Sequence, residues 1–214
     1  MKFTYLAFAL SSVFFFASCG SEQPKEGEGD TTNEAADENV ETTTLNVDTE
    51  ASKITWLGSM TGVKSYNHFG ELTISEGTVE VADGALKGGS FTVDMTSMVA
   101  TDSNYTEEKP AAYLIQHLSD SSFFGVAQFP TASFVITKVE GNTITGDLTV
   151  RGKTNEETAE IVSSTMTEDG AMNAEAKLTF DRKKYDVAFD MSMMGVSDMF
   201  ISNDIELTIS VVAK

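Results

Sequence analysis

Cysteine is almost absent from this chain, and the single one, Cys19, lies close to the N-terminus. One cysteine cannot form an intramolecular disulfide or a cysteine-rich zinc site, so burial and hydrogen bonds must stabilise the fold. Basic side chains are also scarce, with 14 Lys and Arg against 33 Asp and Glu. This balance argues against nucleic acid as a partner, which needs clustered cations, and against electrostatic docking to anionic lipid surfaces.

Histidine occurs only twice, as His68 and His117, with no HxH or HxxxH spacing. A metal site would therefore need carboxylates from elsewhere in the chain, and we predict no metal-binding residue and no cofactor. A catalytic histidine is one alternative. The simpler interpretation is that each histidine forms hydrogen bonds at an end of the fold, with His117 complementing the last carbonyls of a helix.

The longest apolar run near the start, residues 3–16, is too short for a membrane-spanning helix, which takes about 20 residues. Lys2 precedes it and small residues follow, as in a secretory signal, so we expect residues 1–18 to be a signal peptide. The segment Ala17-Ser18-Cys19-Gly20 resembles the end of a bacterial lipoprotein signal. A plain signal peptide or an uncleaved anchor is the alternative.

The lipoprotein resemblance implies that Cys19 is the lipidation site. It also implies an extracytoplasmic protein anchored in the cell envelope, which we expect to be at the outer membrane, on its periplasmic or surface face. Between residues 20 and 50 the chain has ten acidic side chains against Lys25 and few large apolar ones. Such a segment buries too little surface to offset the entropy of ordering it, so residues 19–43 are predicted to be a flexible acidic tether.

From Thr44 to Lys214 the dominant hydrophobic period is two residues, which is typical of antiparallel strands with one buried face. Turn dipeptides such as Asp83-Gly84 and Asp169-Gly170 separate the runs at short spacing. The clearest alternating runs are 91–95, 144–150, 172–180 and 205–211. We predict that residues 44–214 form an all-β domain of about eight antiparallel strands closed into a β-barrel, with a two-sheet sandwich as the alternative.

One segment departs from the strand pattern. In KPAAYLIQHL, the residues Ala111, Leu114, Ile115 and Leu118 recur at the spacing of one helix face, and Pro110 suits a first helical turn. We predict a short helix over about 110–118, between strands, that leads directly into the aromatic stretch HLSDSSFFGVAQFPTASF. Such a helix would close one end of the barrel.

Motifs spread over residues 44–214 resemble the YceI-like family, whose members are lipocalin-like barrels described as polyisoprenoid-binding. Asp120, Gly125 and Phe129 stand where that family commonly has Ser, Asp and Tyr, and these departures leave the apolar positions intact. The motifs are ITW (54–56), HFG (68–70), GGSFTVDM (88–95), the aromatic stretch (117–134), TGDLTVRGKT (145–154), FDR (180–182) and ISNDIELTISVVAK (201–214).

The resemblance implies an elongated apolar cavity that holds a long isoprenoid chain, such as a polyprenyl phosphate or a quinone tail. Sequence alone leaves open whether the large apolar side chains line such a cavity or fill it. The residues that we predict to bind the ligand are Trp56, His68, Phe91, Leu114, His117, Leu118, Phe123, Phe124, Phe134, Phe180, Arg182, Met191 and Met193.

Two members of this set have competing interpretations. By parity, Arg182 continues the inward face of 172–180 and would meet a phosphate or quinone oxygen, or else pair with a carboxylate of the barrel. Met191 and Met193 share a parity that suits a cavity lining, whereas a soft thioether cluster would bind Cu(I).

We therefore expect an extracytoplasmic lipoprotein that holds an isoprenoid-type lipid for storage or transport, with no enzymatic activity. One alternative is a stress-linked envelope interaction protein whose barrel is filled by side chains. Another is a lipid-modifying enzyme that depends on His68 or His117. The oligomeric state is open, with a dimer as one option.

Overall fold

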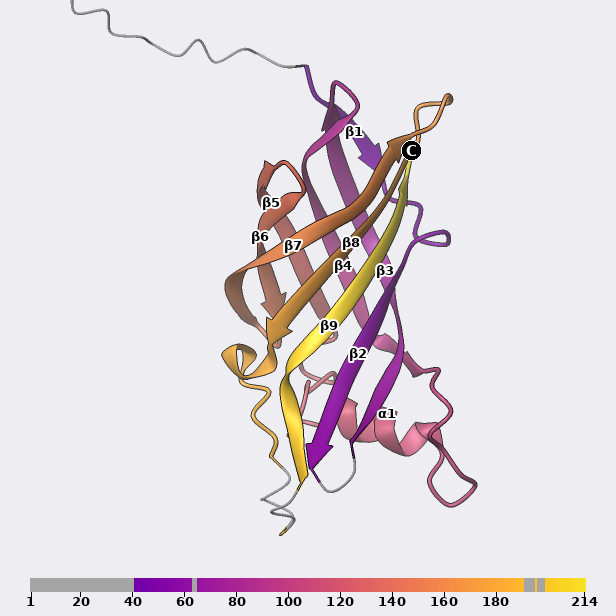
Figure 1. Cartoon of the computed structure of the whole chain (residues 1–214), viewed down its shortest axis with the longest axis vertical. Coiled ribbons are helices and arrows are strands. Elements are labelled where there is room, and N and C mark those ends of the chain that lie inside the picture. Colours follow the sequence, from indigo (N-terminus) through magenta and orange to yellow (C-terminus); the bar gives the residue numbers. More distant parts are fainter. Residues whose placement is uncertain (1–40, 63–64, 191–194, 196–198) are drawn as a thin grey trace, which may run out of the picture. The chain divides into compact units, whose positions relative to one another are not determined.

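The alternating runs form long antiparallel strands that wind around one interior (Figure 1). The computed structural model describes residues 41–62, 65–190, 195 and 199–214, all within the unit Asn39–Lys214. The elements are β1 (Thr43–Asn46), β2 (Lys53–Gly62), β3 (Tyr66–Ala82), β4 (Ala85–Ala100), α1 (Ala111–Ser119), β5 (Thr131–Glu140), β6 (Thr143–Val150), β7 (Lys153–Met166), β8 (Met172–Asp181), the 3₁₀-helix η1 (Arg182–Tyr185) and β9 (Met199–Ala213).

The sheet closes on itself. Its hydrogen-bonded order is β3-β2-β9-β8-β7-β6-β5-β4, and β4 pairs back onto β3. Every pairing in this ring is antiparallel. The prediction of an all-β, lipocalin-like barrel of about eight strands is thus confirmed. The sandwich alternative is wrong, because the β3–β4 ladder leaves no break in the ring.

β1 is a ninth strand that pairs with the last part of β3, with Thr43 opposite Val81. Beyond it, Val47 forms a bridge with Ala213, and the backbone N–H of Asp48 donates to the carbonyl of Val212. Residues 43–48 therefore pair with the parts of β3 and β9 that extend beyond the start of β2. β1 and the C-terminus lie at the same end of the barrel, at the top of Figure 1.

The inward and outward faces follow the predicted alternation. Leu148 and Leu178 are buried, whereas their strand neighbours Asp147 and Lys177 are exposed. The turn at Asp83-Gly84 has positive φ at both residues, 53° and 72°, which gives a hairpin twist that matches the strands. The apolar period therefore fixes the register of the barrel wall.

Helix α1 connects β4 to β5 at the end opposite to β1 (Figure 1). Its bounds agree within one residue with the predicted helix, and none of its residues is fully buried. After the helix, the carboxylate of Asp120 accepts the N–H of Ser122 and its carbonyl accepts the N–H of Gly125. This turn places Phe123 and Phe124 in the core at the α1 end.

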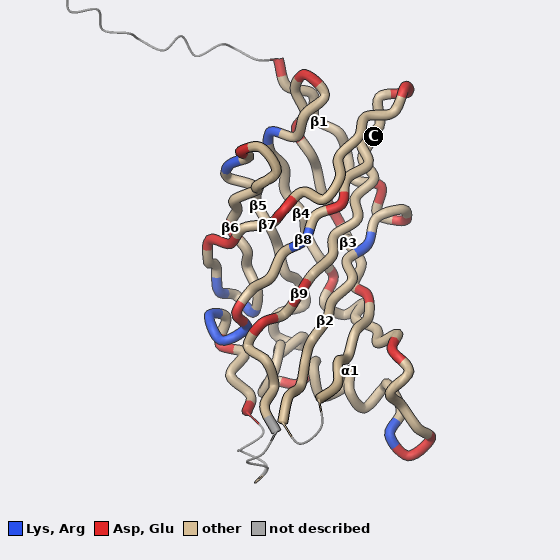
Figure 2. Tube along the Cα trace, in the orientation of Figure 1, with Lys and Arg blue, Asp and Glu red and all other residues tan. Residues whose placement is uncertain are grey.

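Charged residues are distributed along the strands of the barrel and in its loops (Figure 2). No Asp, Glu, Lys or Arg is among the described residues that line the interior. Because a charged group is expensive to bury unless it is paired, this separation leaves the interior suited to apolar contents.

Candidate functional site: the barrel cavity

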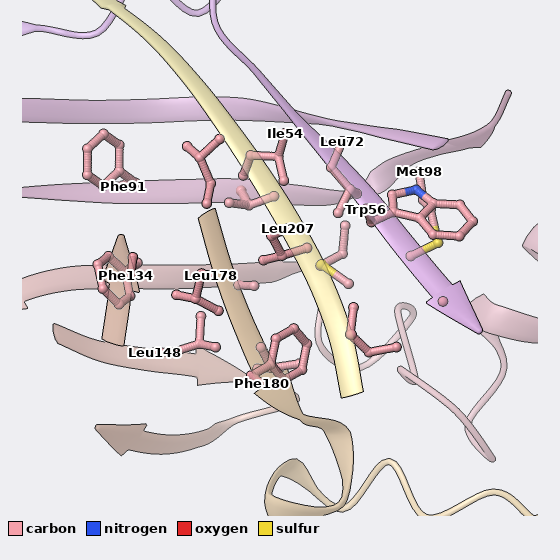
Figure 3. Close-up of a pocket in the computed structure, with 18 of the residues that line it drawn as sticks. Ile54, Trp56, Leu72, Phe91, Met98, Phe134, Leu148, Leu178, Phe180 and Leu207 are labelled. Carbon is pink, nitrogen blue, oxygen red and sulfur yellow. The ribbon is translucent and has the colours of Figure 1, made fainter. Parts of the chain in front are cut away.

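The interior of the barrel contains a cavity of about 470 Å³. Apolar side chains from β2, β3, β4, β5, β6, β8 and β9 point into it, among them Trp56, Phe134 and Leu207 (Figure 3). Ligand sites usually measure about 300–1,000 Å³, so this space matches a binding site in size. The alternative function assumed a barrel that is filled by side chains, and the barrel of this structure is not filled.

Most of the predicted ligand-binding residues line this cavity; whether they bind a ligand stays a prediction. Met191 and Met193, and the predicted lipidation site Cys19, lie outside the described residues. The predicted residues that line the cavity are Trp56, His68, Phe91, Leu114, His117, Leu118, Phe123, Phe124, Phe134 and Phe180.

Two motif glycines let aromatic rings lie across neighbouring strands. A Cβ at Gly70 would come within 1.8 Å of the carbonyl oxygen of Val99 and 2.8 Å of the Trp56 ring. The indole Nε1 of Trp56 donates to that same carbonyl at 3.2 Å. Likewise, a Cβ at Gly146 would lie 2.5 Å from the Phe134 ring. A residue larger than glycine would not fit at Gly70 of the HFG motif or at Gly146 of the TGDLT motif, because aromatic side chains of neighbouring strands occupy the space.

At the α1 end, aromatic rings close part of the cavity. The ring of His117 packs edge-on against Phe189, with centroids 4.6 Å apart, and against Phe123 at 5.5 Å. Phe123 in turn contacts Phe124 at 5.2 Å. Within the described part of the chain the His117 ring makes no hydrogen bond, so the expectation of a hydrogen-bonding role is not met there. Its role in these contacts is that of an aromatic ring.

The expectation for Arg182 is wrong in its geometry. β8 ends at Asp181 and Arg182 begins η1, so strand parity does not continue and the side chain does not line the cavity. Arg182 is 1% exposed, and its guanidinium donates to the backbone carbonyls of Ser202 (2.9 Å), Ile201 (3.4 Å) and Val187. It also lies 5.7 Å from the centre of the Phe123 ring.

The surroundings of Arg182 indicate a structural role for its guanidinium. Burial lowers the pKa of its guanidinium, while the charges of Asp181 and Asp190 raise it. Because its N–H groups are engaged by main-chain oxygens, the guanidinium ties η1 to β9 underneath Phe123. It is poorly placed to meet a lipid headgroup.

His68 reaches the cavity from β3 and is held from behind by two residues of the loop after β4. Its Nδ1 lies 3.2 Å from Oδ2 of Asp102 and 3.1 Å from the hydroxyl of Tyr105. That hydroxyl donates to Asp102 at 2.6 Å. The Tyr105 ring also stacks on the imidazole, with centroids 5.5 Å apart. Sequence reasoning missed Asp102 and Tyr105, since no motif marks the loop that carries them.

Burial affects both partners of His68. Burial raises the pKa of Asp102, but hydrogen bonds from Tyr105, Asn104, His68 and Phe69 outweigh it and hold this pKa below its usual value. Burial and the neighbouring carboxylate raise the pKa of the Tyr105 hydroxyl. Asp102 is therefore a buried carboxylate, with its side chain 1% exposed, and it keeps its charge at neutral pH.

In the described residues, no group of three or more His, Cys, Asp and Glu side chains is arranged to hold a metal ion. None of the helices in that same part of the chain is long and apolar enough to cross a bilayer.

Comparison with known proteins shows where this architecture occurs. Residues 45–213 match the YceI-like domain. The structure is similar to Burkholderia cenocepacia BcnA, with a TM-score of 0.58 and 16% identity, covering 78% of this chain and 99% of that one. It is also similar to a polyisoprenoid binding domain from Saccharophagus degradans, with a TM-score of 0.53 and 10% identity, covering 79% and 97%. At these identities the likeness establishes the fold.

Sequence similarity to curated relatives is more local. A UPF0312 protein of Staphylococcus aureus (strain USA300) is 32% identical over 82 residues, which cover 36% of this chain and 48% of the relative. A UPF0312 protein of Staphylococcus epidermidis is 29% identical over 83 residues, with the same coverage. The chain thus spans about half the length of the curated relatives it matches.

Proposed function

Because the chain belongs to the YceI-like family, we propose that its barrel binds the isoprenoid tail of a lipid. The observation that carries this proposal is the 470 Å³ cavity with no charged residue among its described lining. A cavity of such composition offers water few hydrogen-bond partners, and an apolar cavity of about 150 Å³ in another protein stays dry and binds an apolar ligand. The polyisoprenoid binding domain from Saccharophagus degradans has the same fold.

The energetics favour a long, apolar, flexible chain. Burying apolar surface contributes about 25 cal/mol per Å², and the loss of chain flexibility offsets part of it. An isoprenoid tail has no polar groups, so it loses no hydrogen bonds to water when it enters the apolar cavity. The protein's action is binding, for storage or transport, without turnover of the lipid.

We also propose an extracytoplasmic location with a lipid anchor on Cys19, supported by the signal-like segment before it. Acyl chains on this cysteine would hold the domain at a membrane through the acidic tether. In a bacterial host, the mature protein should fractionate with membranes and carry added lipid mass. The Cys19→Ser variant should lose both; equal membrane association of the two proteins would refute the anchor.

The binding proposal is tested by lipid mass spectrometry. The Cys19→Ser form of the whole protein, which is expected to be free of the membrane, would be exported in a bacterial host, purified without detergent and extracted with organic solvent. We expect a stoichiometric species with an isoprenoid tail. Ala176→Trp, which places an indole in the cavity, should abolish it, whereas Lys177→Trp on the exposed face of β8 should not. A ligand-free protein that also refuses added isoprenoids would refute the proposal.

A further inference from the structure

The polar side chains of the cavity lining are few, and His68 differs from the others because a buried charge positions it. Its ring lines the cavity, while Nδ1 faces Asp102 and Tyr105. Asp102 is itself fixed by backbone N–H groups, from Phe69 at 3.2 Å and Asn104 at 3.0 Å. This loop therefore holds the imidazole in one orientation at the cavity wall.

The hydrogen-bond pattern determines which ring nitrogen carries the proton. The Tyr105 hydroxyl gives its hydrogen to Asp102, so toward His68 only its lone pairs remain. Both neighbours of Nδ1 are then acceptors, and Nδ1 must be the N–H donor. In the neutral imidazole, Nε2 is therefore an acceptor. No residue in the described part of the chain forms a hydrogen bond with Nε2.

From this arrangement we infer that Nε2 of His68 accepts a hydrogen bond from an uncharged hydroxyl headgroup of the lipid. The inference rests on the proposed function and narrows it to lipids of the prenol or quinol type. Asp102 and Tyr105 act as positioning residues, because they present Nε2 to the cavity without touching the lipid.

The charges around the site disfavour a phosphate headgroup. The nearest fixed charge to the imidazole is the carboxylate of Asp102, which repels an anion. No Lys or Arg occurs among the described lining residues, and Arg182 donates to backbone carbonyls instead. Lys64 lies outside the described residues, so phosphate recognition is included as an outcome of the test.

The test uses Trp56, the one tryptophan of the chain, as a fluorescent reporter in the cavity wall. The full-length protein is titrated at pH 8, where imidazoles are usually neutral, with geranylgeraniol, its methyl ether and its monophosphate. One hydrogen bond should make the prenol bind roughly three- to ten-fold more tightly than the ether, which cannot donate. His68→Phe should remove this preference and retain ether binding, and Asp102→Asn should reduce it.

His117→Phe is the matched control, because this second histidine lines the same cavity without a polar partner in the described structure. It should change prenol and ether affinities by the same factor. Equal affinity of the unmodified protein for prenol and ether, or a preference for the phosphate, would overturn the inference and leave the proposed function intact. Failure to bind any of the three probes would instead overturn the proposed function. The comparisons of prenol with ether and of prenol with phosphate both use the unmodified protein, so neither requires a variant to fold.

Discussion

At the residue scale, the same side-chain type performs different tasks because its neighbours differ. His68 faces a buried carboxylate and a tyrosine hydroxyl, whereas His117 faces the rings of Phe123 and Phe189. Both line one cavity, but only the first has a hydrogen-bonded orientation in the described structure. Chemical identity alone therefore does not determine which histidine would recognise a polar group.

The contact of Gly70 with Trp56 and Val99 leads to a stability prediction. Gly70→Ala should lower the free energy of unfolding by about 1–3 kcal/mol, because the added methyl group collides with a backbone carbonyl that cannot move freely. Urea denaturation followed by circular dichroism measures this. Gly58→Ala, whose Cβ would meet only Ile205 at 3.8 Å, is the matched control and should change stability much less. Equal effects would contradict the packing argument.

The lowered pKa of Asp102 predicts a pH dependence. An unfolded Asp titrates near 3.9, so this carboxylate contributes stability that is complete above about pH 5 and is lost as pH falls through its lower folded pKa. Asp102→Asn should destabilise the protein at pH 7 by about 1–3 kcal/mol, since hydrogen bonds to a buried charge are lost.

The readout for Asp102 is the difference in melting temperature between pH 7 and pH 3. That difference should be smaller in Asp102→Asn than in the unmodified protein. Asp147→Asn, on the exposed face of β6, should keep the original difference. An unchanged pH dependence in the Asp102 variant would show that the carboxylate is not linked to folding.

At the element scale, periodicity predicts regular structure well and its interruptions poorly. Alternating runs such as 144–150 identify strands and their inward faces, because one face of each strand must be buried. The same logic fails at Arg182, where the chain leaves the strand and the carboxylate of Asp181 caps η1 by accepting the N–H of Lys183. Asp102 and Tyr105 lie in an irregular loop, and only tertiary contacts bring them to His68.

Helix α1 should respond to ligand more than the barrel wall does. It contributes Leu114, His117 and Leu118 to the cavity, yet none of its residues is fully buried and it packs mainly on β4. Elements with few buried contacts open at low free energy. In hydrogen–deuterium exchange, loading with geranylgeraniol should therefore slow exchange in 111–119 more than in β7. Protection confined to the strands would show that ligand binding does not stabilise the helix.

At the scale of the whole molecule, the closed barrel separates charge from the interior. The chain carries a formal charge of -19, yet no described acidic residue lines the cavity; the acidic residues are distributed along the strands and loops (Figure 2). Outside this closed ring, β1 pairs with the part of β3 that β2 does not reach. We therefore expect β1 to contribute to the stability of the barrel.

Removing β1 should therefore destabilise the whole domain. A chain beginning at Ser52 loses the paired hydrogen bonds between Asn46 and Lys214, the buried side chain of Val47 and the 2.7 Å ion pair between Asp48 and Lys214. It also leaves an unpaired edge on β3. We expect the free energy of unfolding in urea to fall by about 2–5 kcal/mol, mostly from lost apolar burial. A chain beginning at Glu41 keeps β1 and should match the full-length protein. If both shortened chains unfold at the same urea concentration, β1 does not stabilise this end of the barrel.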